Sequence, residues 1–162
     1  MRRRIIRERV LQALYAHEVS GDPVEHVIAH TVHGLDDNKQ AYEFARRLVI
    51  ETVHHAPQID KVIRSKVANW DFKRIALIDR LVLRMAICEL IYFQEIPPKV
   101  SMNEAIELAK LFSTEKSGQF VNGVLDAVLD DLKAAGDIHK TGRGLFDGLT
   151  PRTGGGQTKK AS

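Results

Sequence analysis

Arginines are concentrated at the start of the sequence. Arg2, Arg3, Arg4, Arg7 and Arg9 lie within the first nine residues, and Arg3 and Arg7 are one helical turn apart. A helix start carries a partial positive charge and favours Asp or Glu, so this placement slightly weakens a helix. The guanidinium group is a planar fork of donors that suits phosphate oxygens and stacks on bases. Two interpretations are open: a solvated helix start, or a segment that binds nucleic-acid phosphates.

The charge distribution along the chain favours the second interpretation. The 162 residues carry a net charge of +3. Residues 1–9 carry +4 and residues 136–162 carry +3, which leaves −4 for residues 10–135. Any contact with a polyanion should therefore begin at the N-terminal arm rather than across a uniformly basic surface.

Other residues whose types could bind a metal or a phosphate, or act as a nucleophile, are better explained as ordinary structural residues. His26, His30 and His33 have a spacing that can bind zinc, but no Cys or clear carboxylate completes the set, so we expect them to face solvent. Cys88 lies in an apolar stretch and is expected to be a buried small side chain. The Gly154–Gly156 run follows no strand and opens no helix, unlike a phosphate-binding loop. We therefore expect no enzyme, no cofactor and no metal.

The periodicity of the chain is helical throughout, which predicts an all-α fold of about seven helices. The expected N-caps are Asp22, Ser101 and Ser117, and Ser101 would form a capping box with Glu104. Gly136 is expected to close the last helix. Residues 69–75 are the least regular interior segment. The expected helices are 3–19, one capped by Asp22, one from about 39 to before Pro57, 58–68, 76–93, and two opened by Ser101 and Ser117.

Some polar positions in the last two helices have two interpretations. Asn103 and Glu107 either lie on a solvated face or are partly buried to fix a helix contact. Asn122 raises the same question. Gly123 beside it costs about 1 kcal/mol relative to Ala in a helix, which a close helix–helix approach would offset.

Composition suggests one helical domain followed by a tail. Hydrophobic residues make up 44% of the chain, enough for a packed core in residues 1–136, and the segment 76–93 should be its central helix. Residues 137–162 are rich in glycine and poor in apolar side chains, so we expect this basic tail to be disordered or weakly docked, and dispensable for folding.

The same totals bear on location. No apolar run approaches the ~20 residues of a membrane span. The basic start is not followed by an apolar signal region. A single cysteine suits a reducing compartment. We therefore expect a cytoplasmic protein with no membrane partner.

Four motifs, in order, carry a resemblance to a known family. They are RRxxRExxLQALY from Arg3, Trp70 followed by IDRLVLRMAICEL, NEAIELAKLF and FVNGVLD. Together they resemble the NusB family of bacterial transcription antitermination factors. The resemblance implies two packed three-helix bundles and binding to boxA, a short single-stranded RNA element of ribosomal RNA leader transcripts. It also implies a small-subunit ribosomal protein partner, NusE, a place in the RNA polymerase antitermination complex, and neither catalysis nor a cofactor.

The resemblance assigns RNA-binding positions along the chain. The arginine-rich segment of the family matches the N-terminal arm, where Ile5 departs from the pattern and Arg2 can compensate. Lys116 occupies a loop position that can be acidic in relatives, and an aromatic at the RNA surface matches Phe120. The RNA-binding residues implied by the resemblance are Arg2, Arg3, Arg4, Arg7, Lys116 and Phe120.

Two further positions fall where the family meets its ribosomal-protein partner, namely Tyr15 and Asp79. Asp79 also suits the start of a helix on electrostatic grounds alone. The alternative hypothesis is a helical interaction adaptor or homodimer module without direct RNA binding, in which the arginines only solubilise the start. RNA affinity of the purified protein distinguishes the two.

Overall fold

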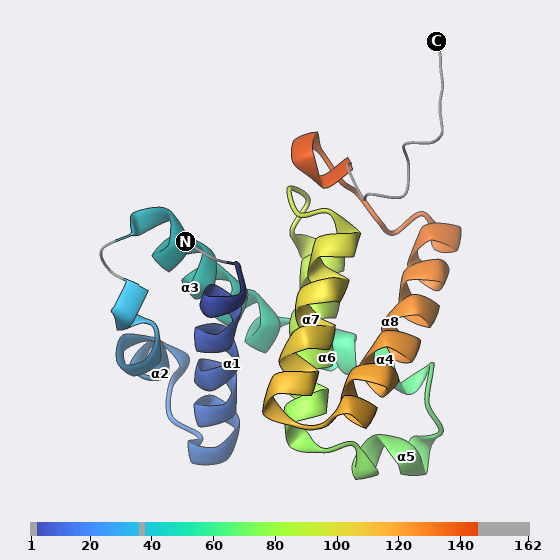
Figure 1. Ribbon diagram of the computed structural model, residues 1–162, viewed down its shortest axis with the longest axis horizontal. Helices are drawn as coiled ribbons and strands as arrows, with labels where there is room; N and C mark the ends of the chain where they lie inside the picture. Colours follow the sequence, from blue (N-terminus) through green and yellow to red (C-terminus); the bar gives the residue numbers. More distant parts are fainter. Residues whose placement is uncertain (1–2, 36–37, 146–162) are drawn as a thin grey trace.

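The computed structural model describes residues 3–35 and 38–145, and every regular element in these two ranges is helical (Figure 1). No helix in the described part is long and apolar enough to cross a membrane. The elements are α1 (Arg3–Ser20), α2 (Val24–Thr31), η1 (His33–Leu35), α3 (Lys39–His54), α4 (Ala56–Arg64), α5 (Asn69–Arg74), α6 (Leu77–Tyr92), α7 (Pro98–Phe112), α8 (Glu115–Ala135) and η2 (Gly142–Leu145).

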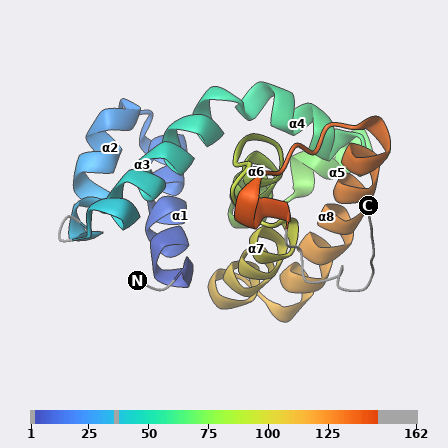
Figure 2. The ribbon, with the colours of Figure 1, turned by 90° about the horizontal axis from the view of Figure 1, so that it is seen from above.

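The helices form two packed bundles, as expected. Helices α1, α2 and α3 pack on one another, and α6, α7 and α8 form the second group, with α4 lying against α6 (Figures 1 and 2). Helix α6 joins the two, because it also contacts α1 and α3. Its side chains are all buried or half-buried, which confirms the prediction of a central helix.

All three predicted N-caps are wrong, because the helices begin at other residues than predicted. Pro23, not Asp22, precedes the first residue of α2, and no side chain caps that helix. Helix α7 begins at Pro98, so Ser101 lies inside it and its hydroxyl donates to Glu89 rather than capping. Thr114 takes the capping role predicted for Ser117, accepting the Ser117 N–H at 3.0 Å.

Other local predictions have mixed outcomes. The segment predicted to be irregular, 69–75, contains the short helix α5. Gly136 ends α8 with a φ of 74°, a left-handed conformation that glycine adopts without strain, as predicted. Asn103 and Asn122 are exposed, and Gly123 has open space around it rather than a close helix neighbour. The solvated interpretation therefore holds for these positions.

The chain continues past α8 as a docked segment, residues 137–145, which we call the C-terminal strap. The Lys140 ammonium donates to the carbonyl oxygens of Glu89 and Phe93, at 3.0 and 2.8 Å. The Thr141 N–H donates to the Gln94 carbonyl. A Cβ on Gly144 would collide with that same carbonyl oxygen, so only glycine fits there. The strap is thereby held over the α6–α7 turn; the rest of the predicted tail, 146–162, lies outside the described residues.

Candidate nucleic-acid interface

The first turn of α1 presents arginines and no acidic residue. Arg3 is exposed. Arg4 is half-exposed, and its Nε lies 3.0 Å from Oε1 of Glu104 on α7. This ion pair holds the start of α1 against the second bundle, and the Arg4 side chain remains 41% exposed. Arg2 lies outside the described residues.

Arg7 is placed differently from the arginines around it. Its side chain is buried, 2% exposed as a whole residue, and it forms two hydrogen bonds to the Glu89 carboxylate, at 2.8 and 2.6 Å. Ser101 donates to the same carboxylate at 2.7 Å. Burial alone would lower the pKa of Arg7, but the charge and hydrogen bonds of Glu89 outweigh it and raise that pKa further. Arg7, one of the RNA-binding positions that the resemblance implies, therefore belongs to the core.

The buried pair follows from where its two elements cross. Arg7 shares a face of α1 with Val10, Leu11 and Leu14, at spacings of three, four and seven residues. That face packs towards α6, where Glu89 is a carboxylate in an otherwise apolar helix. Pairing neutralises both charges where neither can reach water. The geometry commits the Arg7 guanidinium to Glu89 instead of a phosphate.

Lys116 and Phe120 lie on the first two turns of α8, which follows the C-terminal end of α7, whereas Arg4 pairs with Glu104 near the middle of α7. Both are exposed. Helix α7 connects the two places: Glu104 pairs with Arg4, and the Lys110 side chain lies over Gly118 of α8. At 1.5 Å per residue, Glu104 and Lys110 are about 9 Å apart along the helix. The structure therefore places the predicted RNA residues in two groups along α7 rather than in one cluster.

The two residues predicted to meet a protein partner also have different surroundings. Tyr15 is 44% exposed on the outer face of α1. Asp79 is only 7% exposed, and its Oδ2 accepts the Ser117 hydroxyl at 2.9 Å. Burial raises the pKa of Asp79, and the hydrogen bond from Ser117 opposes that rise. Its Oδ1 atom is buried without a hydrogen bond in the described part of the chain. Asp79 thus ties the start of α6 to the start of α8.

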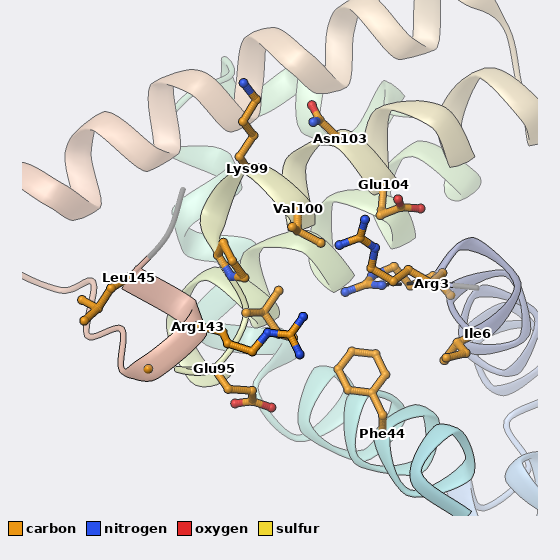
Figure 3. A pocket seen from close by; sticks show the side chains of 14 residues that line it. Arg3, Ile6, Phe44, Glu95, Lys99, Val100, Asn103, Glu104, Arg143 and Leu145 are labelled. Atoms are coloured by element: carbon orange, nitrogen blue, oxygen red, sulfur yellow. Dashed lines mark hydrogen bonds between the residues drawn. The ribbon is translucent and has the colours of Figure 1, made fainter. Parts of the chain in front are cut away.

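A cleft of about 900 Å³ opens beside Arg3, between the two bundles (Figure 3). Its walls come from α1, α3, the α6–α7 turn, α7 and the C-terminal strap. Arg3 and Arg143 extend into it from opposite sides, and Phe44 lies on its α3 wall (Figure 3). Sequence reasoning missed Phe44, Lys99 and Arg143 as neighbours of Arg3. Only the basic charge of the tail gave any signal, and it did not indicate where Arg143 would lie.

The alternative chemistry weighed for Cys88 and the histidines gains no support. Burial raises the pKa of the Cys88 thiol to about 12, so it remains protonated and unreactive. His26 and His30 are exposed and lie against each other, with ring centroids 4.4 Å apart and planes tilted by 45°. In residues 3–35 and 38–145, no group of three His, Cys, Asp or Glu side chains is arranged to hold a metal.

Comparison with known proteins identifies the family. The model of the NusB family matches residues 4–130. The chain belongs to the NusB family. Its relatives include proteins called transcription antitermination protein NusB. The one from Salinibacter ruber is 46% identical over 155 residues, 94% of this chain and 97% of the relative. The one from Bacillus mycoides is 42% identical over 132 residues, 82% of this chain and 100% of the relative.

Solved NusB structures share the fold. NusB of T. maritima superposes with a TM-score of 0.74 at 36% identity, covering 81% of this chain and 92% of that one. A structure of the antitermination factors NusB and NusE in complex with double-stranded RNA gives a TM-score of 0.73 at 30% identity, covering 80% and 96%. The names of these NusB relatives agree with the expectation of a transcription factor rather than an enzyme.

Proposed function

We propose that this protein is a transcription antitermination factor that binds the boxA element of ribosomal RNA leader transcripts together with the ribosomal protein NusE. The family match over residues 4–130 carries this proposal. A family member has been solved with NusE and RNA, which supports both kinds of partner. The protein acts in the bacterial cytoplasm as part of the RNA polymerase antitermination complex, and supports efficient transcription of ribosomal RNA genes.

The exposed arginines give the proposal its chemistry. The exposed Arg3 and the half-exposed Arg4 lie at the N-terminus of α1, where free backbone N–H groups also favour anions. RNA phosphates at this end relieve the conflict between the arginines and the helix dipole. Arg7 does not itself contact RNA. Its pair with Glu89 holds α1 against α6 and so positions the exposed arginines.

A single strand suits the second group of residues better than a duplex. Phe120 is 36% exposed on α8 and can stack on an unpaired base, while Lys116 one turn earlier can meet a phosphate. Stacking of this kind requires bases that are not already paired. We therefore propose that a single-stranded element runs along α7 from Arg3 and Arg4 to Phe120.

The ribosomal protein binds a more apolar surface, next to the place where the proposed RNA path ends. Tyr15 and Val19 near the end of α1 are 44% and 61% exposed, and Leu111 and Phe112 at the end of α7 are 59% and 41% exposed. Large exposed apolar side chains that gather at one end of a molecule are typical of a protein interface. Asp79 supports this end by holding Ser117.

The test is binding of the purified protein to fluorescently labelled RNA. Single-stranded boxA, a scrambled strand and a boxA duplex are compared, each with and without the purified ribosomal protein. We expect the boxA strand to bind most tightly, and more tightly still with the partner. Equal affinity for the scrambled strand would remove boxA recognition, and tightest binding of the duplex would remove the single-strand assignment.

The same exposed apolar side chains favour a second candidate function. A homodimer or adaptor without direct RNA binding would use Val19, Leu111 and Phe112 to bind a second copy or another protein. Light scattering over a range of protein concentrations detects the dimer. A stable dimer that binds no RNA, with or without the ribosomal protein, would replace the first proposal with this one.

A further inference from the structure

The cleft between the two bundles combines features that a nucleotide needs. It is about 900 Å³ in volume, in the range of small-molecule sites, and opens next to the exposed Arg3 (Figure 3). Any strand that binds the N-terminus of α1 therefore passes its mouth.

The charge inside the cleft is positive once internal ion pairs are taken into account. Of the acidic residues that line it, Glu104 is paired with Arg4 at 3.0 Å and Glu95 with Arg47 at 2.7 Å. Arg3, Lys99 and Arg143 also line it and form no ion pair within the described ranges. Three cations with no ion pair to any described residue are suited, around one cavity, to a phosphate, which Arg can hold with two donors at once.

One wall of the cleft offers an aromatic surface. The half-buried Phe44 ring lies edge-on to Phe93, with centroids 5.5 Å apart and planes at 77°. This contact and the Arg7 guanidinium, which lies over the ring at 5.1 Å from its centroid, fix the orientation of Phe44. Ile96 and Val100 line the cleft as well. An unpaired base can pack on such a ring whatever its identity.

The C-terminal strap places Arg143 in this cavity. Lys140, Thr141 and Gly144 fix the strap to the end of α6 and to the carbonyl of Gln94. Arg143 lies between these anchors on η2, and its side chain reaches over the cleft towards Arg3 (Figure 3). The family match ends at residue 130, so this cation is outside the matched region.

We propose that the cleft receives one nucleotide of the bound single-stranded RNA, with its phosphate between Arg3 and Arg143 and its base against Phe44. Lys99 contributes further positive charge at the cleft. The inference rests on the proposed RNA binding and adds the C-terminal strap to the binding site. The occupant is a nucleotide within a strand, because the cleft is continuous with the arginines at the start of α1.

The first test measures RNA affinity of the full-length protein at several salt concentrations. Arg143→Ala should weaken binding of the boxA strand roughly three- to tenfold and lower the salt slope by about 0.7, the value for one phosphate contact on a single strand. Lys133→Ala is the matched control, because it removes one exposed positive charge near the end of α8, outside the cleft. Thermal melting of both variants should equal that of the unaltered protein.

The outcomes separate this inference from the proposed function. If the unaltered protein binds boxA and Arg143→Ala behaves like Lys133→Ala, the strap has no place in the site and only this inference fails. If the unaltered protein binds no RNA with or without the ribosomal protein, both fail. A double variant adds a check: when Arg3 and Arg143 hold one phosphate, the loss in Arg3→Ala/Arg143→Ala is smaller than the product of the single losses.

The second test locates the base. BoxA strands carrying a single 5-iodouridine are crosslinked to the protein by light, and the modified peptide is identified by mass spectrometry. We expect one position of the strand to crosslink at Phe44, and Phe44→Leu to abolish that product. Crosslinks confined to α7 and α8 would overturn the assignment, as would tight binding of adenosine monophosphate in competition with boxA, which would make the cleft a site for free nucleotides.

Discussion

Arg3 and Arg7 are one turn apart on α1, yet one guanidinium is exposed and the other is buried against Glu89. A buried ion pair is weak evidence for stability, because desolvation of both charges opposes their attraction. Loss of only one partner is costly, since the other charge then stays buried alone. The Arg7–Glu89 pair therefore specifies how α1 meets α6, while Arg3 remains available to a ligand.

This contrast predicts that two equivalent substitutions change the free energy of unfolding by very different amounts. Arg7→Ala should lower the free energy of unfolding by about 3–5 kcal/mol, because it leaves the Glu89 carboxylate buried with only Ser101 as a partner. Arg3→Ala should change it by less than about 0.5 kcal/mol, as for other exposed sites. Urea unfolding followed by circular dichroism measures both. Equal, small changes would show that the buried pair does not hold the bundles together.

Asp79 gives a second residue-scale prediction, based on pH. Burial raises its pKa in the folded protein above the usual value of 3.8, so the folded state holds that proton more tightly than the unfolded chain. Stability therefore falls as pH rises from about 4 through the raised pKa, and the cost persists at neutral pH. Asp79→Asn keeps an acceptor for Ser117 and cannot ionise, so its stability relative to the unaltered protein should increase over this pH range.

Chemical unfolding between pH 3.5 and 7 measures the unfolding free energy of Asp79→Asn minus that of the unaltered protein. Asp130→Asn, at an exposed position on α8, is the control. A decrease in this difference as pH rises contradicts the raised pKa.

The same variant tests the partner assignment. A direct ion pair between Asp79 and NusE predicts lower partner affinity, whereas a support role through Ser117 predicts unchanged affinity.

At the scale of elements, the C-terminal strap depends on a lysine in an unusual environment. Lys140 donates to two carbonyls at the end of α6, where a cation suits the negative end of the helix dipole. Burial nonetheless lowers the pKa of Lys140 to about 8, against the opposing charges of Glu89 and Glu95. Docking of the strap is therefore coupled to pH in the mildly alkaline range.

The coupling has a definite sign. Between pH 8 and the ordinary lysine pKa of 10.5, the unfolded chain holds the proton more tightly than the folded protein. Unfolding free energy should therefore rise with pH over this window, relative to the Lys140→Met variant, and the difference should be flat below pH 7. Guanidinium unfolding from pH 7 to 10.5 measures it, with Lys133→Met as the exposed control. If the unfolding free energy of the unaltered protein instead falls relative to that of Lys140→Met as pH rises, the lowered pKa is contradicted.

At the scale of the whole molecule, helical periodicity and the Gly and Pro breaks predicted the order of helices and the central place of 76–93. Two of the predictions that failed concern serines that have distant as well as local hydrogen-bond partners. Ser101 and Ser117 fit a capping pattern, but their hydroxyls bond to Glu89 and Asp79 instead. No local pattern contains such contacts, because they exist only once helices distant in sequence pack together.

In the candidate site, too, local sequence patterns could predict some features, whereas others depend on contacts between distant helices. Arg7 could have been recognised as buried from its position on the apolar face of α1, together with a lone Glu in an apolar helix. Phe44 and Arg143 could not, because their proximity to Arg3 depends on the packing of the two bundles and on the anchoring of the strap. Composition describes the tail as glycine-rich and basic, but composition does not state where its first nine residues bind.

The salt dependence of RNA binding tests how the whole molecule divides its arginines between structure and recognition. Arg3 and Arg4 present accessible guanidinium groups, whereas Arg7 is committed to Glu89. On a single strand each phosphate contact contributes about −0.7 to the slope of log K against log salt. Arg3→Ala/Arg4→Ala should therefore flatten that slope by about 1.4 and weaken boxA binding at low salt.

The control variant, Arg46→Ala/Lys133→Ala, removes two positive charges elsewhere and should leave the slope nearly unchanged. Fluorescence anisotropy titrations at four salt concentrations give both slopes, and an unaltered slope in the Arg3/Arg4 variant, with its melting temperature preserved, would exclude the start of α1 from the RNA site.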